Sequence, residues 1–332
     1  MLNIKYVTTI LFSFGIAVAN IQTSANAADQ KWTFDGAIHN NSLAVSPDET
    51  MAVASYSERQ EIVVYDLKSK SVRKILRGYI TPRNSVFDPS GKAFYVSDSS
   101  LGVIKKIDAT SLEEIGQFAA GPGVFGTTIS ADGKTLYANN EAANTVTSFN
   151  LNTNQPTAVI PGFSQPRQGV RLNPNGDTLF VTNFLGDKIT LVNTKTNQID
   201  GEIAGFNKIR AISISHDGKT LYAANSGSNM IAVVNIADRK ITSMIPVGKD
   251  PYGAALTPDG KFLYSGNLAD NSLTVISLPS EHVVASVDGL KQPRQAIVFS
   301  HNSKLAYVLN EDLSVAIINL DNNKIAEVIL PH

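Results

Sequence analysis

The sequence repeats a short turn signal at nearly constant spacing, and this repeat limits the folds that the chain can adopt. From the second copy on, the signal ends at Gly91, Gly133, Gly176, Gly218, Gly260 and Ser303, so successive copies lie 42 or 43 residues apart. The first copy, Ser46-Pro47-Asp48, is expected to be one residue shorter in its turn. Seven tandem copies therefore fill most of the chain.

Each copy contains four short segments with the composition of β-strands. In the fourth copy, residues 179–183, 189–193 and 199–203 are rich in β-branched and aromatic side chains and are separated by turn residues. Helical periodicity is absent after residue 27. Four-stranded units without helices predict an all-β fold, a seven-bladed β-propeller with four antiparallel strands per blade over residues 41–332. Two separate domains are disfavoured because no linker interrupts the spacing.

The last copy contains its own fourth strand-like segment, residues 324–330. The copies therefore begin on the innermost strand of each blade, and no strand needs to be borrowed from the N-terminus. We expect residues 28–40, which include the single Trp32, to pack at the junction of the first and last blades. The alternative is a frayed terminus.

The first 27 residues have the three-part pattern of a secretory signal peptide. Lys5 is followed by an apolar stretch from Tyr6 to Ala19, and Ala25-Asn26-Ala27 provides a small-x-small cleavage site. The apolar stretch is too short to cross a bilayer comfortably. We expect cleavage after Ala27 and a periplasmic or secreted protein that is not embedded in a membrane.

Two motifs carry a family resemblance. The segments Leu179-Phe180-Val181-Thr182-Asn183 and Thr257-Pro258-Asp259-Gly260 resemble the YVTN-type repeats of YncE-like bacterial propellers, a WD40-like repeat class. The resemblance covers essentially the whole mature chain. It implies a seven-bladed propeller, and the related propellers include lactonases, surface-layer proteins and parts of periplasmic redox systems. Within such a fold the function has to be argued from the site.

The position at the start of the first strand of each copy varies in an unusual way. It is occupied by Asn41, Arg83, Phe125, Arg167, Arg210, Tyr252 and Arg294. Inner strands converge around the channel of a propeller, so these side chains are expected to surround one channel mouth. Arginine offers forked donors to phosphate or carboxylate, and aromatic rings offer stacking faces. The alternative is that nearby loop acids neutralise the arginines. These acids are Glu141, Asp187, Asp250, Asp270, Glu311 and Asp312.

Arg171 departs from the repeat at a second position, where the other copies hold small or modest side chains. We expect it either to project into the channel or to form a buried structural ion pair. It completes the predicted ligand-binding set with the four mouth arginines, Phe125 and Tyr252.

Catalytic patterns are sparse. The chain has no cysteine, its histidines lack metal-ligand spacing, and neither a nucleophile elbow nor a phosphate-binding glycine loop is present. No catalytic residue, cofactor or transition metal is therefore predicted. A Ca²⁺ ion held by channel carbonyls or loop carboxylates stays open.

The net charge of −1 argues against a globally basic nucleic-acid binder. The leading hypothesis is an exported, non-enzymatic, monomeric binding protein. Its channel mouth would bind an anion: a nucleic acid, a phosphorylated small molecule or an acidic protein loop. The alternatives are a lactonase-type hydrolase or lyase, with Glu141 or Glu311 as general acid or base, and an accessory subunit of an envelope redox pathway.

Overall fold

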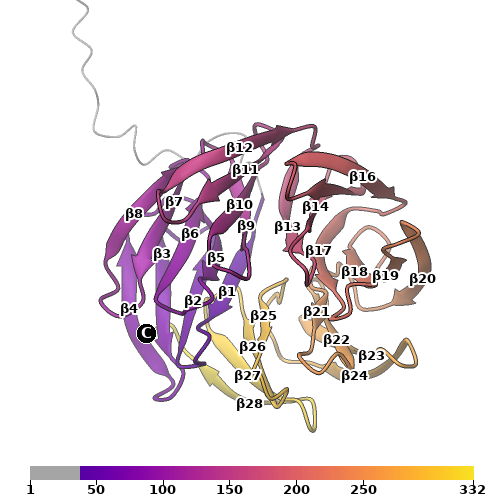
Figure 1. Ribbon diagram of the computed structural model, residues 1–332. Coiled ribbons are helices and arrows are strands. Elements are labelled where there is room, and N and C mark those ends of the chain that lie inside the picture. The colour runs from indigo at the N-terminus through magenta and orange to yellow at the C-terminus, as the bar shows by residue number, and fades with distance from the viewer. Residues whose placement is uncertain (1–37) are drawn as a thin grey trace, which may run out of the picture. The chain divides into compact units, whose positions relative to one another are not determined.

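The computed structural model describes residues 38–332, and these residues form seven four-stranded antiparallel sheets arranged as the blades of a ring (Figure 1). Within every sheet the strands follow one another in chain order. The predicted seven-bladed β-propeller is confirmed. The predicted signal peptide and Trp32 lie outside the described residues, so the predictions made for them stay predictions.

The strands of the first four blades have the same order from the inner to the outer edge. Blades 1 and 2 consist of β1 (Asn41–Val45), β2 (Met51–Tyr56), β3 (Glu61–Asp66), β4 (Ser71–Arg77), β5 (Pro82–Phe87), β6 (Ala93–Asp98), β7 (Val103–Asp108) and β8 (Glu114–Ala119). Blades 3 and 4 consist of β9 (Val124–Ile129), β10 (Thr135–Asn140), β11 (Thr145–Asn150), β12 (Gln155–Pro161), β13 (Pro166–Leu172), β14 (Thr178–Asn183), β15 (Lys188–Asn193) and β16 (Gln198–Ala204).

The last three blades keep this order, and the inner strands of blades 6 and 7 are shorter than those of the other blades. Blade 5 consists of β17 (Ile209–Ile214), β18 (Thr220–Asn225), β19 (Met230–Asn235) and β20 (Lys240–Pro246). Blades 6 and 7 consist of β21 (Ala255–Leu256), β22 (Phe262–Asn267), β23 (Ser272–Ser277), β24 (His282–Val287), β25 (Ile297–Phe299), β26 (Leu305–Leu309), β27 (Val315–Asn319) and β28 (Lys324–Ile329). Among the described residues no helix is long and apolar enough to cross a membrane.

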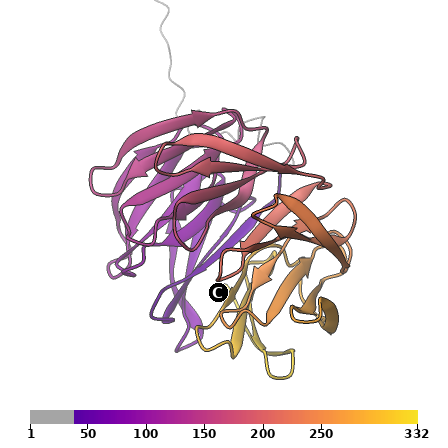
Figure 2. The same ribbon diagram turned by 45° about the vertical axis from the view of Figure 1, so that its right-hand side comes forward.

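The core is divided into seven hydrophobic clusters, one at each junction between neighbouring blades. The blades follow one another around the ring (Figure 2). One blade buries neither face alone, so the side chains of neighbouring blades pack together in these clusters. The second and third strands of each blade are the most buried, whereas the outer strands alternate between exposed and covered residues. The packing of each junction therefore depends on side chains from both of the blades that form it.

Blade 7 closes the ring against blade 1 without borrowing a strand, because β28 completes its own sheet. Tyr65 in blade 1 donates a hydrogen bond to the Leu313 carbonyl over 2.5 Å, and the Asn41 side chain donates to the Leu309 carbonyl over 3.3 Å. The hydrophobic cluster at this junction combines residues from both ends of the propeller. Closure thus uses the same side-chain packing as the other six junctions.

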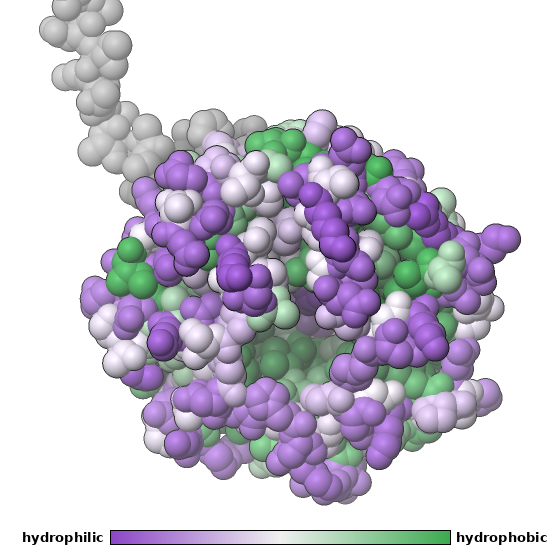
Figure 3. All heavy atoms as spheres, in the orientation of Figure 1, coloured by the Kyte–Doolittle hydropathy of each residue, from purple (hydrophilic) through white to green (hydrophobic). Residues whose placement is uncertain are grey.

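The inner strands surround a central channel. Neighbouring inner strands contact one another from β1 through β21, and β1 also contacts β25. The molecular surface is hollowed near the centre of the ring, with apolar side chains on the floor of the hollow and polar side chains around it (Figure 3). The channel is therefore the place where residues from all seven blades can meet.

The first repeat turn is not shorter than the others, which corrects the sequence-based expectation. The final position of the turn needs a positive φ, which Gly91 adopts at 71° and Gly176 at 73°. In the first copy Glu49 takes this position with φ 56°, and in the seventh Ser303 takes it with φ 53°. The sequence-based prediction made this turn one residue too short because glutamate rarely adopts a left-handed backbone conformation, so Glu49 was not recognised as the final turn residue.

Acid is expected to destabilise the propeller through these turns. The pKa of Asp132 is lowered by the Ser130 hydroxyl and the Lys134 amide, and the pKa of Asp217 is lowered by Ser215 and the Lys219 amide. An aspartate whose pKa is lower in the folded state than in the unfolded state stabilises the fold at pH values above its ordinary pKa of 3.8. This stabilisation is lost as the pH falls through the folded-state pKa. The thermal midpoint should therefore be steady from pH 7 to about 5 and fall below about 4.

The seventh copy supplies the control for this prediction. There Asn302 accepts hydrogen bonds from the Ser300 hydroxyl and the Lys304 amide, so an amide fits the same turn. Circular dichroism melts of Asp132→Asn/Asp217→Asn should show a shallower acid decline than the parent. An identical decline would show that other groups control acid unfolding.

Candidate functional site

The predicted mouth residues lie where the inner strands begin. Arg83, Phe125, Arg167 and Arg210 lie in β5, β9, β13 and β17, whereas Tyr252 and Arg294 precede β21 and β25. Strand pairing is irregular here, with register shifts between Pro82 and Ser85, between Pro166 and Val170, and between Ile209 and Ile212. Such bulges redirect side chains out of the alternating pattern of a strand.

The side chains of three arginines interleave with two aromatic rings. The guanidinium carbon of Arg167 lies 3.7 Å from the Phe184 ring centroid, and that of Arg210 lies 4.7 Å from the same ring. Arg210 also lies 4.3 Å from the Tyr252 ring, and Arg294 lies 4.9 Å from it. We call these five residues the arginine–aromatic stack. Cation–π attraction offsets part of the repulsion between its charges.

Phe184 is the member of the stack that the sequence-based set of site residues omitted. It follows Asn183 at the end of β14, one strand away from the arginines. The same position in the other blades holds Ser57, Ser99, Glu141, Ser226, Leu268 and Glu311. An aromatic ring at a mostly polar position was the available signal, and its contact with Arg210 requires the geometry of two neighbouring blades.

Arg83 lies outside the stack and is fully buried. Its Nε donates to the Ser99 hydroxyl over 2.9 Å, and its Nη1 donates to the Ile38 carbonyl over 2.7 Å and to Asn40 Oδ1 over 2.9 Å. The guanidinium also lies 4.6 Å from the Phe125 ring, which is fully buried as well. These contacts join the segment before blade 1 to blade 2.

Arg167 has a carboxylate partner. Its Nε lies 3.4 Å from Glu141 Oε2, and the Glu141 side chain is only 2% exposed. Burial lowers the pKa of Arg167 to about 10, while the charge of Glu141 acts in the opposite direction. Arg167 therefore stays protonated at neutral pH, and the predicted pairing with loop acids is present at this one stack position.

Arg210 and Arg294 form no ion pair with any residue between 38 and 332. Arg210 donates through Nε to the Ser226 hydroxyl over 3.0 Å, and the Nε of the buried Arg294 has no hydrogen-bond partner. Burial lowers the pKa of Arg210. Asp312, one of the acids considered as a partner, instead pairs with Lys291 at 2.6 Å. The charge of Asp250 opposes part of the effect of burial on the pKa of Arg210, but neither Arg210 nor Arg294 has a carboxylate within ion-pair distance among the described residues.

Buried amides fix the loops that carry the stack. Asn183 accepts a hydrogen bond from the Ser164 amide over 2.7 Å, and Asn310 accepts one from the Lys291 amide over 2.8 Å. Both side chains belong to the asparagine position that ends the second strand of most blades. The loops before Arg167 and Arg294 are therefore held by the repeat itself.

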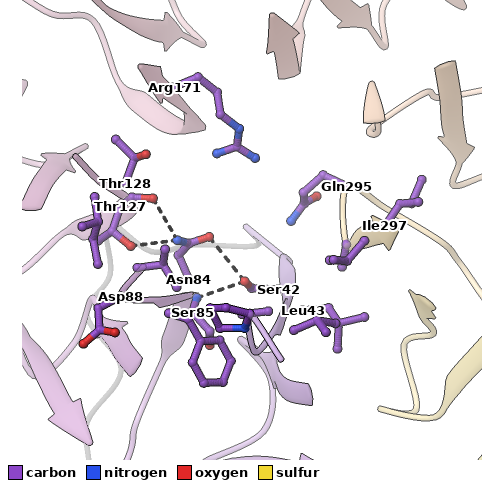
Figure 4. Close-up of a pocket in the computed structure, with 18 of the residues that line it drawn as sticks. Ser42, Leu43, Asn84, Ser85, Asp88, Thr127, Thr128, Arg171, Gln295 and Ile297 are labelled. Atoms are coloured by element: carbon purple, nitrogen blue, oxygen red, sulfur yellow. Dashed lines mark hydrogen bonds between the residues drawn. The ribbon is translucent and has the colours of Figure 1, made fainter. Parts of the chain in front are cut away.

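Arg171 is separated from the other predicted site residues. It lies near the far end of β13, four positions after Arg167, and its guanidinium extends into a cavity of the channel (Figure 4). It forms no ion pair with a described residue. Of the two sequence-based alternatives, the structure shows the side chain projecting into the channel.

A second cavity of about 480 Å³ opens beside the ion pair of Arg167 and Glu141. Its lining includes Glu141, Phe163, Gln165 and the exposed Leu185. Within residues 38–332 no group of three or more His, Asp or Glu side chains is placed to hold a metal ion. The chemistry available at the mouth is therefore that of guanidinium groups, aromatic rings and one buried carboxylate.

The fold and its repeat match a known family. The family model described as "Lactonase, 7-bladed beta-propeller" matches residues 37–200 and 192–283. The chain belongs to this lactonase family of seven-bladed propellers. No curated protein sequence matches the chain. The resemblance to YncE-like proteins with YVTN repeats stays a prediction from the motifs.

Solved structures agree with the architecture of this lactonase-family chain. Hydrazine synthase of Kuenenia stuttgartiensis superimposes with a TM-score of 0.76 at 19% identity, over 83% of this chain and 94% of that chain. At this identity the likeness shows the fold alone. What the lactonase-family propeller binds has to follow from its own side chains.

Proposed function

We propose that this lactonase-family propeller is an exported, monomeric binding protein that holds a multiply charged small anion at the arginine–aromatic stack. The observation that carries the proposal is the pair Arg210 and Arg294, a half-buried and a buried cation that form no ion pair with a described residue. Enclosing such charges is unfavourable unless counter-charge is supplied. A phosphorylated or polycarboxylated small molecule supplies it and matches the forked guanidinium donors.

The burial of the rings favours a small anion over a nucleic acid. Phe125 is 0% exposed and Tyr252 is 9% exposed. Single-stranded nucleic acids bind through aromatic faces on which bases stack, and these two faces are covered by arginine side chains. An acidic protein loop would meet the same obstacle of limited access.

The test is isothermal titration calorimetry with glycerol 3-phosphate and citrate. We expect the double variant Arg210→Gln/Arg294→Gln to lose at least about 100-fold in affinity, since a hydrogen bond to a charged group contributes roughly 1.5–3 kcal/mol. The exposed Arg239, which pairs with Asp200 at 3.0 Å, provides the control variant Arg239→Gln. Equal affinity in the double variant and the control would contradict the proposal.

Lactone hydrolysis is the second candidate, supported by family membership and by the buried Glu141 beside a cavity. A carboxylate next to a cavity is a suitable general base for water attack on a lactone carbonyl. A pH-stat assay with glucono-δ-lactone should then show turnover that Glu141→Gln abolishes without loss of folding. Absence of turnover in the parent protein would remove this candidate.

A further inference from the structure

The channel contains a charged side chain, that of Arg171, which is not part of the arginine–aromatic stack at the channel mouth. Arg171 occupies an inner-strand position where the other six blades hold Ala44, Val86, Thr128, Ser213, Ala255 and Val298. Because those side chains are short, the channel widens at this level, and three adjoining cavities of about 480, 250 and 370 Å³ all include Arg171 in their linings. The guanidinium of Arg171 thus faces a space in the channel that the short side chains of the other six blades do not fill.

The guanidinium of Arg171 is poorly satisfied by protein. Its Nη1 donates to the Val170 carbonyl over 2.9 Å, and no other hydrogen bond or ion pair to a described residue forms. A guanidinium has five N–H donors, so most of them point to the channel interior. The side chain is exposed to that interior yet surrounded by protein, and this enclosure lowers the pKa of Arg171. An anion in the channel would meet it with little competition.

The opposite wall offers rigid polar groups. Ser42 donates to Asn84 Oδ1 over 3.3 Å, and Asn84 Nδ2 donates to the Thr127 hydroxyl over 2.8 Å (Figure 4). Gln295 extends into the same cavity and donates through Nε2 to the Asn41 carbonyl. The cavity therefore places a cation that forms no ion pair with a described residue opposite a wall of polar side chains.

The composition of the cavity selects the class of ligand. Its volume of about 480 Å³ is typical of small-molecule sites, and Ala44, Val86 and Ile297 add apolar wall. A single cation balances a single negative charge. Asp88 also lines the cavity, so a phosphate dianion would meet repulsion from its carboxylate. A carboxylate matches the guanidinium fork, and a ligand hydroxyl can hydrogen-bond to the partly buried Asn84 on the opposite wall.

We propose that this cavity is a second binding site, distinct from the arginine–aromatic stack, for a small hydroxy-monocarboxylate anchored by Arg171. The carboxylate lies against the guanidinium, the hydroxyl hydrogen-bonds to Asn84, and the apolar part contacts the inner strands. This second site uses none of the residues of the arginine–aromatic stack. An experiment that contradicts the function proposed for the channel mouth would therefore not contradict the Arg171 site.

The test is isothermal titration calorimetry of the purified protein with lactate, 3-hydroxybutyrate, lactamide and inorganic phosphate. We expect the two hydroxy acids to bind, while the neutral lactamide and phosphate bind at least tenfold more weakly. Arg171→Gln should lose at least tenfold in hydroxy-acid affinity, and Arg210→Gln/Arg294→Gln should keep it. Failure of both hydroxy acids to bind at millimolar concentration, tighter binding of phosphate, or unchanged binding in Arg171→Gln would overturn the proposal.

A second measurement needs no variant. Phenylglyoxal modifies accessible arginines, and peptide mass spectrometry of the parent protein locates the modified residues. We expect Arg171 to be modified, lactate to protect it, and lactamide to leave it unprotected. Modification of Arg171 at the same rate with and without lactate would contradict the site even where Arg171→Gln does not fold.

Discussion

Replacing Arg83 with methionine is expected to lower the free energy of unfolding by about 3 to 5 kcal/mol. The side chain is 0% exposed, and its loss leaves three acceptors without their donor: the Ile38 carbonyl, Asn40 Oδ1 and the Ser99 hydroxyl. Methionine keeps the length and the apolar contact with Phe125 but donates nothing. Urea unfolding followed by circular dichroism measures the change.

Arg294→Met is the matched control for this prediction. Arg294 is also buried, at 5% exposure, and also lies against an aromatic ring, but its Nε has no hydrogen-bond partner. Because Arg294 is a buried cation that forms no ion pair with a described residue, its replacement should leave the free energy of unfolding unchanged or raise it. Equal losses in the two variants would show that the bonds of Arg83 are not what stabilises the junction of blades 1 and 2.

The second large effect is expected at Asp98, which ends β6 in blade 2 and is fully buried. Its carboxylate accepts from the amides of Ile80 at 2.7 Å, Thr81 at 3.1 Å, Ser100 at 3.1 Å and Leu101 at 3.0 Å. Asp98→Ala leaves four amide donors without this acceptor, so we expect a loss of about 3 to 5 kcal/mol in unfolding free energy.

Asp98→Asn is the control, because the third to seventh blades hold asparagine at this position. The amide keeps one acceptor oxygen, so about half of the loss should be recovered. Thermal and urea unfolding of both variants provide the measurement. An alanine variant within about 1 kcal/mol of the parent would mean that water replaces the carboxylate without difficulty.

The fold could be predicted because its information is local and appears seven times. Turn residues such as Asp132 and Gly133 determine the backbone geometry of the few residues around them. Each strand can be recognised from its β-branched and aromatic side chains. Even an atypical copy, such as the one with Glu49 in the turn, did not obscure the blade count. Spacing alone then left a ring of four-stranded blades as the consistent arrangement.

The candidate site was predictable only in part. The positions of Arg210 and Arg294 at one end of the inner strands followed from the repeat, but their environment did not. Phe184 reaches Arg210 from a different strand of the neighbouring blade, and Glu141 reaches Arg167 in the same way. Contacts between blades depend on the twist and spacing of two sheets, which a repeat pattern does not encode.

By itself the sequence determined the seven blades, the order of their strands and the positions at which arginine departs from the repeat, because each depends on signals a few residues long. The tertiary structure decided which arginines differ in role. It buried Arg83 among acceptors, paired Arg167 with Glu141, and left Arg171 facing an open channel without an ion-pair partner among the described residues. Burial and counter-charge are properties of the assembled ring, since the atoms that supply them come from separate blades.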